Sequence, residues 1–310
     1  MPRVSTLFKT VLLLSSFMAS PLVSAESITV NHVLGSTVIP DTPERVIVVG
    51  GNGSLDVLHR LGIKPVGAVT TLMPDYLKDF AKEGIVHVGS TKEVDYEKIF
   101  TLKPDVIIAE ARMVDAYPTL SSIAPTVMYT VEYGNYWEDT QRNWRMLGKI
   151  FNKEQIVEDY INETNDQFAA IQAQVKKNDL NTLAVMNNGN NVSMFGREGR
   201  FSVIFNELGF KEAKGTDSTN PHGNLISFEF IAEAAPDVLF ILDREQAIGA
   251  SVGKAKTLFD NPLIKSTPAY KNNRIVYLNP TAWYISIAGM DATQIMIDDM
   301  NAVFSPKTAH

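Results

Sequence analysis

The sequence predicts an α/β protein with two Rossmann-like lobes, each built on a central parallel sheet, joined by a single long α-helix. Three observations lead to this fold class. Short apolar runs alternate with segments of helical spacing in both halves of the chain, which is typical of parallel sheets covered by helices. Residues 137–177 contain no proline and separate the two halves. One sequence unit also recurs in both halves at a constant spacing.

The composition is that of an ordinary soluble globular protein. The 310 residues suffice for two domains, and 45% of them are hydrophobic while 20% are charged. The net charge of −7 argues against nucleic acid or an anionic membrane as a general partner. The absence of cysteine excludes a disulfide scaffold and thiolate catalysis.

The first 25 residues have the pattern of a signal peptide. Arg3 and Lys9 supply positive charge, residues 11–18 are apolar, and a small-residue cleavage site ends at Ala25. The apolar stretch is short and interrupted for a membrane span, and an uncleaved anchor is the alternative. Because a lipid anchor needs a cysteine at the cleavage site, we expect a freely diffusing protein. A cell with one membrane would lose such a protein, which favours a periplasm.

We expect the first lobe over residues 26–136. Apolar and polar residues alternate over residues 26–40, which predicts an edge hairpin. Residues 45–50 form an apolar run typical of a buried parallel strand, and helical spacing follows over residues 54–61. Further strands are expected at residues 65–69, 105–109 and 126–130.

The segment 137–177 is expected to hold the helix that links the lobes. Asn152 and Gln155 have the spacing of a capping box. A helix of about 25 residues would span roughly 37 Å, enough to bridge two lobes. The alternative is an ordinary surface helix within one domain. One face of the predicted helix carries the apolar residues Val157, Ile161, Phe168, Ile171 and Val175.

We expect the second lobe over residues 178–310. Two apolar runs flank Asn188-Gly189-Asn190, which is a hairpin signal. Residues 201–208 have helical spacing and end at Gly209. Strands are expected at residues 238–242 and 275–278, and the last helix at 289–304 lies in this lobe or packs back across to the first.

The repeated unit occurs at an offset of 132 residues. In each copy an aromatic residue and a glutamate precede a Pro-Asp-Val run, and an arginine follows the run. Two generic helix–strand units would explain the proline, the aspartate and the apolar residues, but not the paired glutamates and arginines. The positions that match between the two copies are Tyr96, Glu97, Ile99, Pro104 and Arg112 in the first copy, and Phe228, Glu229, Ile231, Pro236 and Arg244 in the second.

The repeat predicts a ligand site between the lobes. Arg112 and Arg244 follow the carboxyl ends of strands, where open parallel sheets bind their ligands, so both would face one cleft. Glu97 and Glu229 lie near the starts of helices, where the helix dipole favours a carboxylate. One glutamate would therefore be exposed on each lobe.

Four motifs carry a resemblance to a known family: Pro43-Glu44-Arg45-Val46, Leu61-Gly62-Ile63, Leu102-Lys103-Pro104-Asp105-Val106-Ile107-Ile108 and Trp283-Tyr284. The chain resembles the periplasmic substrate-binding proteins of ABC importers for iron–siderophores and cobalamin, whose lobes are joined by one long helix. More narrowly, it is similar to the VctP/FatB/CeuE-like group, which binds ferric siderophores of the catecholate type. The resemblance covers essentially the whole mature chain. It implies a binding protein rather than an enzyme, with an Fe(III)–siderophore as ligand and no cofactor.

The resemblance implies three arginines in the cleft. Arg112 and Arg244 match through the repeated unit, and Arg200 matches the third. A ferric tris-catecholate is an anion, and guanidinium groups hydrogen-bond to catecholate rings and stack on them without losing their charge. The alternative for any one arginine is a surface ion pair.

The resemblance also implies that His222, Trp283 and Tyr284 lie at the cleft. Imidazole nitrogen and phenolate oxygen are good ligands for ferric iron. If the siderophore leaves two coordination sites open, His222 and Tyr284 would fill them. With a hexadentate siderophore they would only line the pocket. The alternatives are a solvated loop histidine and a packed Trp-Tyr pair.

Glu97 and Glu229 match the docking carboxylates of the family. The implied partner is an inner-membrane ABC permease, whose arginines would pair with both glutamates. The alternative role is charge complementarity at a helix start, worth under about 1 kcal/mol. We expect a monomer with no nucleic acid partner.

Rival ligands are haem, cobalamin, a hydroxamate siderophore and a bare metal ion. Three arginines favour an anionic chelate, and a bare metal ion usually needs three or four protein ligands. The rival of another class is an exported α/β enzyme. Residues 50–53 are rich in glycine and precede a helix, as in a dinucleotide-binding loop, but Asp56 stands where that motif needs its third glycine.

Overall fold

The computed structural model describes residues 27–40, 42–82, 84–213, 220, 222–250 and 253–305. The predicted signal peptide, residues 1–25, lies outside the described residues. The chain begins its described part with the expected edge hairpin, in which β1 (Ser27–His32) pairs antiparallel with β2 (Gly35–Pro40).

The first lobe is built on a five-stranded parallel sheet in the order β5-β4-β3-β6-β7. All four residues of the central strand β3 are buried, and alternate residues enter two separate cores on the two faces of the sheet. The strands are β3 (Val46–Val49), β4 (Gly67–Ala68), β5 (Val86–His87), β6 (Val106–Glu110) and β7 (Thr126–Tyr129). The helices are α1 (Gly53–Arg60), α2 (Asp75–Lys82), α3 (Tyr96–Thr101), the 3-10 turn η1 (Ala111–Met113) and α4 (Tyr117–Ile123).

The second lobe is built on a mixed sheet in the order β11-β9-β8-β12-β13, with β10 also paired to β8. β8, β10, β12 and β13 run parallel, whereas β9 and β11 pair antiparallel. The predicted hairpin is confirmed, because β8 turns into β9 through Gly189, whose φ is +61°. The strands are β8 (Asn181–Asn188), β9 (Asn191–Phe195), β10 (Lys211–Glu212), β11 (Asn224–Ile226), β12 (Val238–Asp243) and β13 (Ile275–Tyr277). The helices are α7 (Ser202–Asn206), α8 (Phe228–Ala234), α9 (Arg244–Ala247), α10 (Ala255–Leu258), α11 (Pro262–Ser266), α12 (Pro268–Lys271) and α13 (Pro280–Tyr284).

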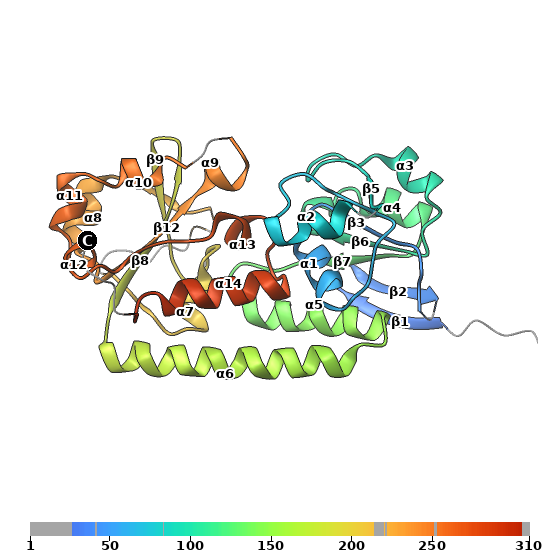
Figure 1. Cartoon of the computed structure of the whole chain (residues 1–310), viewed down its shortest axis with the longest axis horizontal. Coiled ribbons are helices and arrows are strands. Elements are labelled where there is room, and N and C mark those ends of the chain that lie inside the picture. Colours follow the sequence, from blue (N-terminus) through green and yellow to red (C-terminus); the bar gives the residue numbers. More distant parts are fainter. Residues whose placement is uncertain are drawn as a thin grey trace, which may run out of the picture.

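Two helices occupy the linking segment. α5 (Tyr136–Ile150) packs under the first lobe, and α6 (Glu154–Asn178) runs for 25 residues beneath both lobes (Figure 1). The predicted apolar face of α6 is confirmed, since all five of its residues are buried. The predicted capping box is wrong. Lys153 is the N-cap, and Asn152 adopts a φ of +55° and donates from its side-chain amide to the Thr42 hydroxyl.

The last helix, α14 (Met290–Asn301), returns to the first lobe and packs against α1 and α6. The Asp56 carboxylate of α1 accepts the backbone N–H groups of Asp291 and Ala292 at 2.9 and 3.0 Å. Glycine permits this close approach, because a Cβ on Gly53 would lie 2.0 Å from the Ile287 carbonyl oxygen. Lobe boundaries at 26–136 and 178–310 stay a prediction, with α14 reaching from the second lobe to the first.

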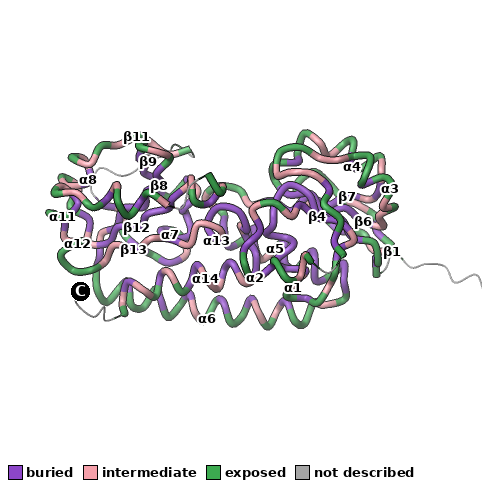
Figure 2. The backbone as a smooth tube through the Cα atoms, turned by 45° about the horizontal axis from the view of Figure 1, so that its top comes forward, coloured by how far each residue is buried: buried purple, intermediate pink, exposed green. Residues whose placement is uncertain are grey.

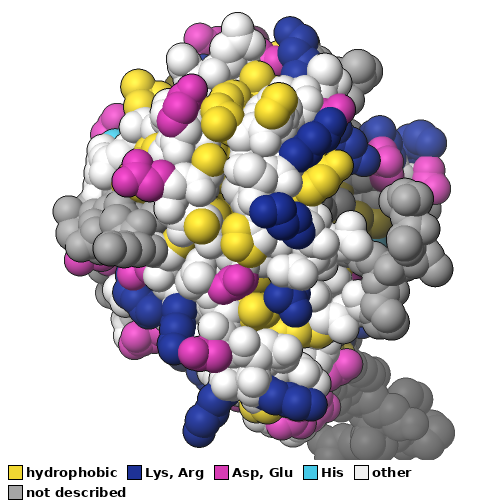
Figure 3. Space-filling view, turned by 90° about the vertical axis from the view of Figure 1, so that its left-hand side faces the viewer, with side chains coloured by type: hydrophobic (Ala, Val, Ile, Leu, Met, Phe, Trp, Pro, Cys, Tyr) yellow, Lys and Arg dark blue, Asp and Glu magenta, His cyan; other side chains and the backbone are white. Residues whose placement is uncertain are grey.

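The lobes share one continuous hydrophobic core. One cluster of buried residues extends from the first sheet through α5, α6 and α14 into the second lobe (Figure 2). On the face of the molecule drawn in Figure 3, basic, acidic and hydrophobic side chains are interspersed. Within the described part of the chain, no helix combines the length and apolar character that a membrane crossing requires.

Candidate functional site

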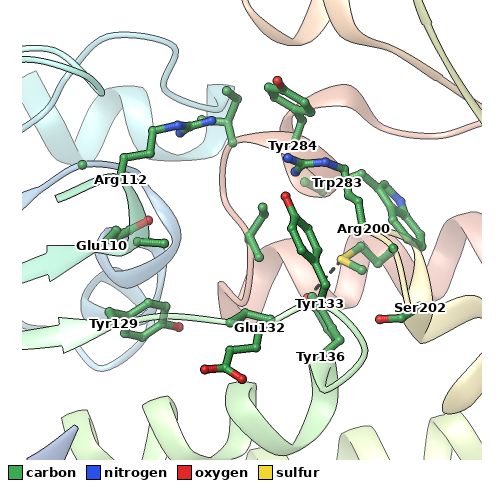
Figure 4. Close-up of a pocket in the computed structure, with 18 residues that line it drawn as sticks. Glu110, Arg112, Tyr129, Glu132, Tyr133, Tyr136, Arg200, Ser202, Trp283 and Tyr284 are labelled. Carbon is green, nitrogen blue, oxygen red and sulfur yellow. Dashed lines mark hydrogen bonds between the residues drawn. The ribbon is translucent and has the colours of Figure 1, made fainter. Parts of the chain in front are cut away.

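A cavity of about 260 Å³ lies between the lobes. Its lining comes from the carboxyl ends of β3, β6 and β7 in the first lobe, and from α13 and the start of α7 in the second (Figure 4). This is the edge at which parallel sheets bind ligands, as the repeated unit predicted.

The two arginines of the repeat occupy equivalent places. Arg112 lies in η1 directly after β6, is exposed, and extends toward the cavity (Figure 4). Arg244 is the first residue of α9, directly after β12. The side chain of Asp243 caps α9 by accepting the Gln246 backbone N–H, which fixes the turn that presents Arg244.

Tyr284 brings Arg200 and Arg244 together. The Arg200 guanidinium carbon lies 4.5 Å from the centre of the Tyr284 ring, and that of Arg244 lies 5.7 Å from it. Arg244 Nε donates to the Tyr284 hydroxyl at 2.9 Å, and Arg244 Nη1 donates to Asn188 Oδ1 at 3.0 Å. Tyr284 itself is 8% exposed, so it is a fixed platform for both cations.

The Arg200 guanidinium is in an electrostatically unfavourable place. Burial lowers the pKa of Arg200, and the positive charge of Arg112 lowers it further, while Tyr133 and Tyr284 act in the opposite direction. Its Nη1 atom is buried and has no hydrogen-bond partner among the described residues. A buried, unpaired cationic donor is costly, so this part of the cavity favours an anionic oxygen.

His222 lies at the edge of the site rather than inside it. Its side chain is exposed and is not part of the cavity lining. Its ring stands edge-on to the Tyr133 ring of the first lobe, with 6.2 Å between ring centres. The structure therefore brings His222 to the cleft but places Tyr133, not Tyr284, against it.

Trp283 is a wall of the cavity and is held by the core. It is 3% exposed, its ring packs on Phe201 at 5.9 Å, and its Nε1 donates to Asp299 at 2.9 Å. Burial raises the pKa of Asp299 to about 6. These contacts hold Trp283 as a packing residue, and its indole N–H already donates its hydrogen bond to Asp299 rather than to a ligand.

Glu110 was missed by the sequence reasoning. It ends β6, lines the cavity and accepts the Ser54 N–H at 2.8 Å and the Ser54 hydroxyl at 2.7 Å. Burial raises its pKa to about 7, against the hydrogen bonds from Ser54. Glu110 thus occupies the N-terminus of α1 that follows the glycine-rich loop, and a Cβ on Gly51 would lie 2.0 Å from Glu110 Oε2. The place where a dinucleotide phosphate would bind is filled by a carboxylate of the protein itself.

Tyr133 was also missed. It lies between β7 and α5, lines the cavity and is 46% exposed. No sequence signal identified it, because it lies in a loop with no counterpart in the repeated unit.

Glu97 and Glu229 lie outside the cavity. Each is exposed in the first turn of its helix, α3 or α8. The helices begin in the same way, because Asp95 and Ser227 cap them by accepting the N–H three residues on. Backbone and Ser227 hydrogen bonds lower the pKa of Glu229. Within the described residues, no group of three or more His, Asp or Glu side chains is placed to hold a metal ion.

Comparison with known proteins gives one consistent result. The periplasmic binding protein family matches residues 47–282. The petrobactin-binding protein YclQ of Bacillus subtilis is 34% identical over 279 residues, covering 89% of this chain and 87% of its own. The ferric-anguibactin-binding protein FatB of Vibrio anguillarum is 33% identical over 279 residues, covering 88% of this chain and 86% of its own. The crystal structure of the catecholate-siderophore-binding protein VctP of Vibrio cholerae superposes with a TM-score of 0.84 at 38% identity, covering 89% of this chain and all of that one. The chain therefore belongs to the periplasmic binding protein family.

Proposed function

We propose that this protein captures a ferric siderophore, of the catecholate or mixed catecholate type, between its two lobes and delivers it to an inner-membrane ABC permease. The observation that carries the proposal is the convergence of Arg200 and Arg244 on Tyr284. Arg200 and Tyr284 line the cavity, and Arg112 extends toward it from the other lobe, whereas Arg244 is not among the lining residues. The ligand is bound and released without chemical change, so the protein is not an enzyme.

The cavity combines positive charge with aromatic surface. A ferric catecholate offers both counterparts, because its oxygens carry the negative charge and its rings can lie on guanidinium or aromatic faces. Related proteins are named for ligands of this kind: VctP for a catecholate siderophore, YclQ for petrobactin and FatB for ferric anguibactin. These likenesses support the chemistry, while the identity of the siderophore is set by this chain's own cleft.

Tyr284 and His222 are the proposed iron ligands for a siderophore that leaves two coordination sites open. The Tyr284 hydroxyl already accepts a hydrogen bond from Arg244 Nε, and this oxygen is the atom that would bind iron. With a hexadentate siderophore, neither residue would touch the metal. An absorption band from phenolate-to-iron charge transfer, present in the loaded wild type and lost in Tyr284→Phe, distinguishes the two cases; a band that persists unchanged argues against ligation.

Glu97 and Glu229 are proposed to dock the protein on the two subunits of the permease. They are exposed on different lobes at the starts of equivalent helices, and each could pair with an arginine of one subunit. We further propose a monomer that is exported by a cleaved signal peptide and acts in the periplasm without a lipid anchor.

The ligand class is tested by quenching of intrinsic fluorescence. Purified protein is titrated with a ferric tris-catecholate, a ferric bis-catecholate, a ferric hydroxamate, haem and cobalamin. We expect saturable, submicromolar binding of at least one ferric catecholate and binding of the others that is at least tenfold weaker. Preferential binding of haem, cobalamin or the hydroxamate would replace the proposed ligand.

Docking is tested separately from capture. Glu97→Arg and Glu229→Arg should leave ligand affinity unchanged and reduce uptake of radiolabelled ferric siderophore into cells. Glu163→Arg is the matched control, since Glu163 is exposed on α6, away from α3 and α8. Normal uptake by the Glu97 and Glu229 variants would show that these carboxylates serve only their helix starts.

A further inference from the structure

Tyr133 reaches across the cleft from the first lobe to the second. Its ring stands nearly perpendicular to the His222 ring, at 84° and 6.2 Å. Its hydroxyl points toward the Arg200 guanidinium (Figure 4). One side chain of the first lobe thus contacts His222 and faces Arg200, two second-lobe residues that the proposed function assigns to the ligand.

These contacts place Tyr133 in competition with a ligand. Among the described residues, the Arg200 guanidinium lies over the Tyr284 ring, and its Nη1 atom has no hydrogen-bond partner. An aryl oxygen of the ligand would need the guanidinium donors that the Tyr133 hydroxyl faces in the empty cleft. A phenol against an arginine and a histidine occupies the position that a ligand aryl group would take.

The cavity is also small for a ferric siderophore, its proposed ligand. Its volume is about 260 Å³, whereas sites for ligands of drug size measure about 300–1,000 Å³. Trp283 and Tyr284 cannot make room, because both are buried and hydrogen-bonded. Tyr133 can, since it is 46% exposed and precedes Gly134, whose φ is +89°.

We propose that Tyr133 is a gate that occupies part of the ligand site in the empty cleft and must swing out before the chelate binds. The gate determines specificity, because it favours ligands whose aryl oxygens can displace a phenol from Arg200, and it sets the size of chelate that enters. This inference rests on the proposed function, and it assigns a role to a residue outside the arginine, histidine and tyrosine set.

The test compares two variants with wild type. Tyr133→Phe keeps the ring and removes the hydroxyl that competes for Arg200, so the dissociation constant for ferric catecholates should fall by about two- to tenfold, the equivalent of one hydrogen bond. The association rate, followed by stopped-flow fluorescence, should rise by a similar factor. Tyr133→Ala also removes the ring, and its gain should be larger for a hexadentate tris-catecholate than for a bis-catecholate. Tyr270→Ala, another half-exposed tyrosine on α12, is the control and should change neither constant.

Unchanged or weaker binding by Tyr133→Phe would overturn the gate, because the hydroxyl would then be idle or would serve the bound ligand. A ligand-free measurement separates this outcome from failure of the proposed function. The ring protons of His222, assigned by NMR with His222→Gln, should shift in Tyr133→Ala because the neighbouring aromatic ring is lost. An unshifted His222 refutes the gate alone, whereas a wild-type protein that binds no ferric catecholate refutes the proposed function.

Discussion

Tyr284 holds two guanidinium groups in two different ways. Its ring lies under Arg200, and its hydroxyl accepts a hydrogen bond from Arg244. Two cations close to one another repel unless negative charge lies between them. The neutral Tyr284 ring attracts both cations only through its quadrupole. An anionic chelate would neutralise their charge more fully than the ring does, which is a physical basis for selective capture of an anion.

The Glu110 carboxyl predicts a pH dependence of stability. Its pKa rises from 4.5 in the reference state to about 7 on burial, so the folded protein holds a proton that the unfolded chain releases between these values. This contribution to stability is present below about pH 4.5 and is lost as the pH rises through about 7. Glu110→Gln should then raise the free energy of unfolding at pH 8 by up to about 3 kcal/mol, and by much less at pH 5.

Urea denaturation at the two pH values measures this difference. Asp56, whose pKa burial also raises to about 7, contributes in the same direction and is unchanged in the variant. Glu138→Gln, at an exposed position on α5, is the control. An effect of Glu110→Gln that is equal at pH 5 and pH 8 would mean that the Glu110 carboxyl does not change its protonation between these pH values.

The sequence predicts some residues of the site better than others. Arg112 and Arg244 could be placed because each follows a strand in a repeated unit, and strand ends meet at one edge of a parallel sheet. Glu110 and Tyr133 could not, because their roles depend on which loops meet across the cleft. The burial of Trp283 could not be predicted either, because it depends on contacts with Phe201 and Asp299, which are distant from Trp283 in the sequence.

At the scale of elements, the junction of α1 with α14 fixes how the lobes meet. Asp56 accepts two backbone N–H groups at the start of α14 and the Tyr76 hydroxyl at 2.5 Å. The Ala288 carbonyl just before α14 accepts from Tyr129 and Trp144, both at 2.6 Å. Four of these bonds join the first lobe or α5 to the returning C-terminal chain. The bond from Tyr76 lies within the first lobe and holds the Asp56 carboxylate in place.

Removing the Asp56 carboxylate should weaken this junction severely. Asp56→Ala leaves the buried N–H of Ala292 and the partly buried donors of Tyr76 and Asp291 without the carboxylate, which should cost about 2–5 kcal/mol of unfolding free energy. Chemical denaturation measures the loss. Asp75→Ala on α2 is the control, because its exposed ion pair with Lys78 is worth little. A loss for Asp56→Ala no larger than that of the control would show that water replaces the carboxylate.

The elements themselves were largely predictable. The apolar face of α6 and the β8–β9 hairpin follow from spacing and turn chemistry, which act over a few residues. The separation of α5 from α6 did not follow, because it depends on the left-handed conformation of Asn152 and its bond to Thr42, more than a hundred residues away. The exact partners of α14 also depend on tertiary contacts that no local pattern encodes.

At the scale of the whole molecule, two features oppose a large closing motion. α6 spans both lobes as one helix of 25 residues, and the main hydrophobic core is continuous between them. Bending would have to open packed surface, which distinguishes this arrangement from lobes linked by flexible strands. Ligand entry then depends on side chains at the cleft more than on movement of whole lobes.

Small-angle X-ray scattering can check this rigidity. The radius of gyration of the empty and loaded protein should differ by less than about 1 Å, because the lobes move little when one helix and a shared core join them. A contraction of several ångströms on loading would mean that the junction of α1 with α14 opens in the free protein.

The measurement that tests the central claim most directly is the affinity for a ferric catecholate after removal of the cleft arginines. Each charge-assisted hydrogen bond is worth about 1.5–3 kcal/mol, so Arg112→Ala, Arg200→Ala and Arg244→Ala should each weaken binding by about 10- to 100-fold. Arg145→Ala, which removes an exposed ion pair with Glu158, should have no effect on binding. Equal affinity in the wild type and the three cleft variants, with the fold intact, would contradict the assignment of these guanidinium groups to an anionic chelate.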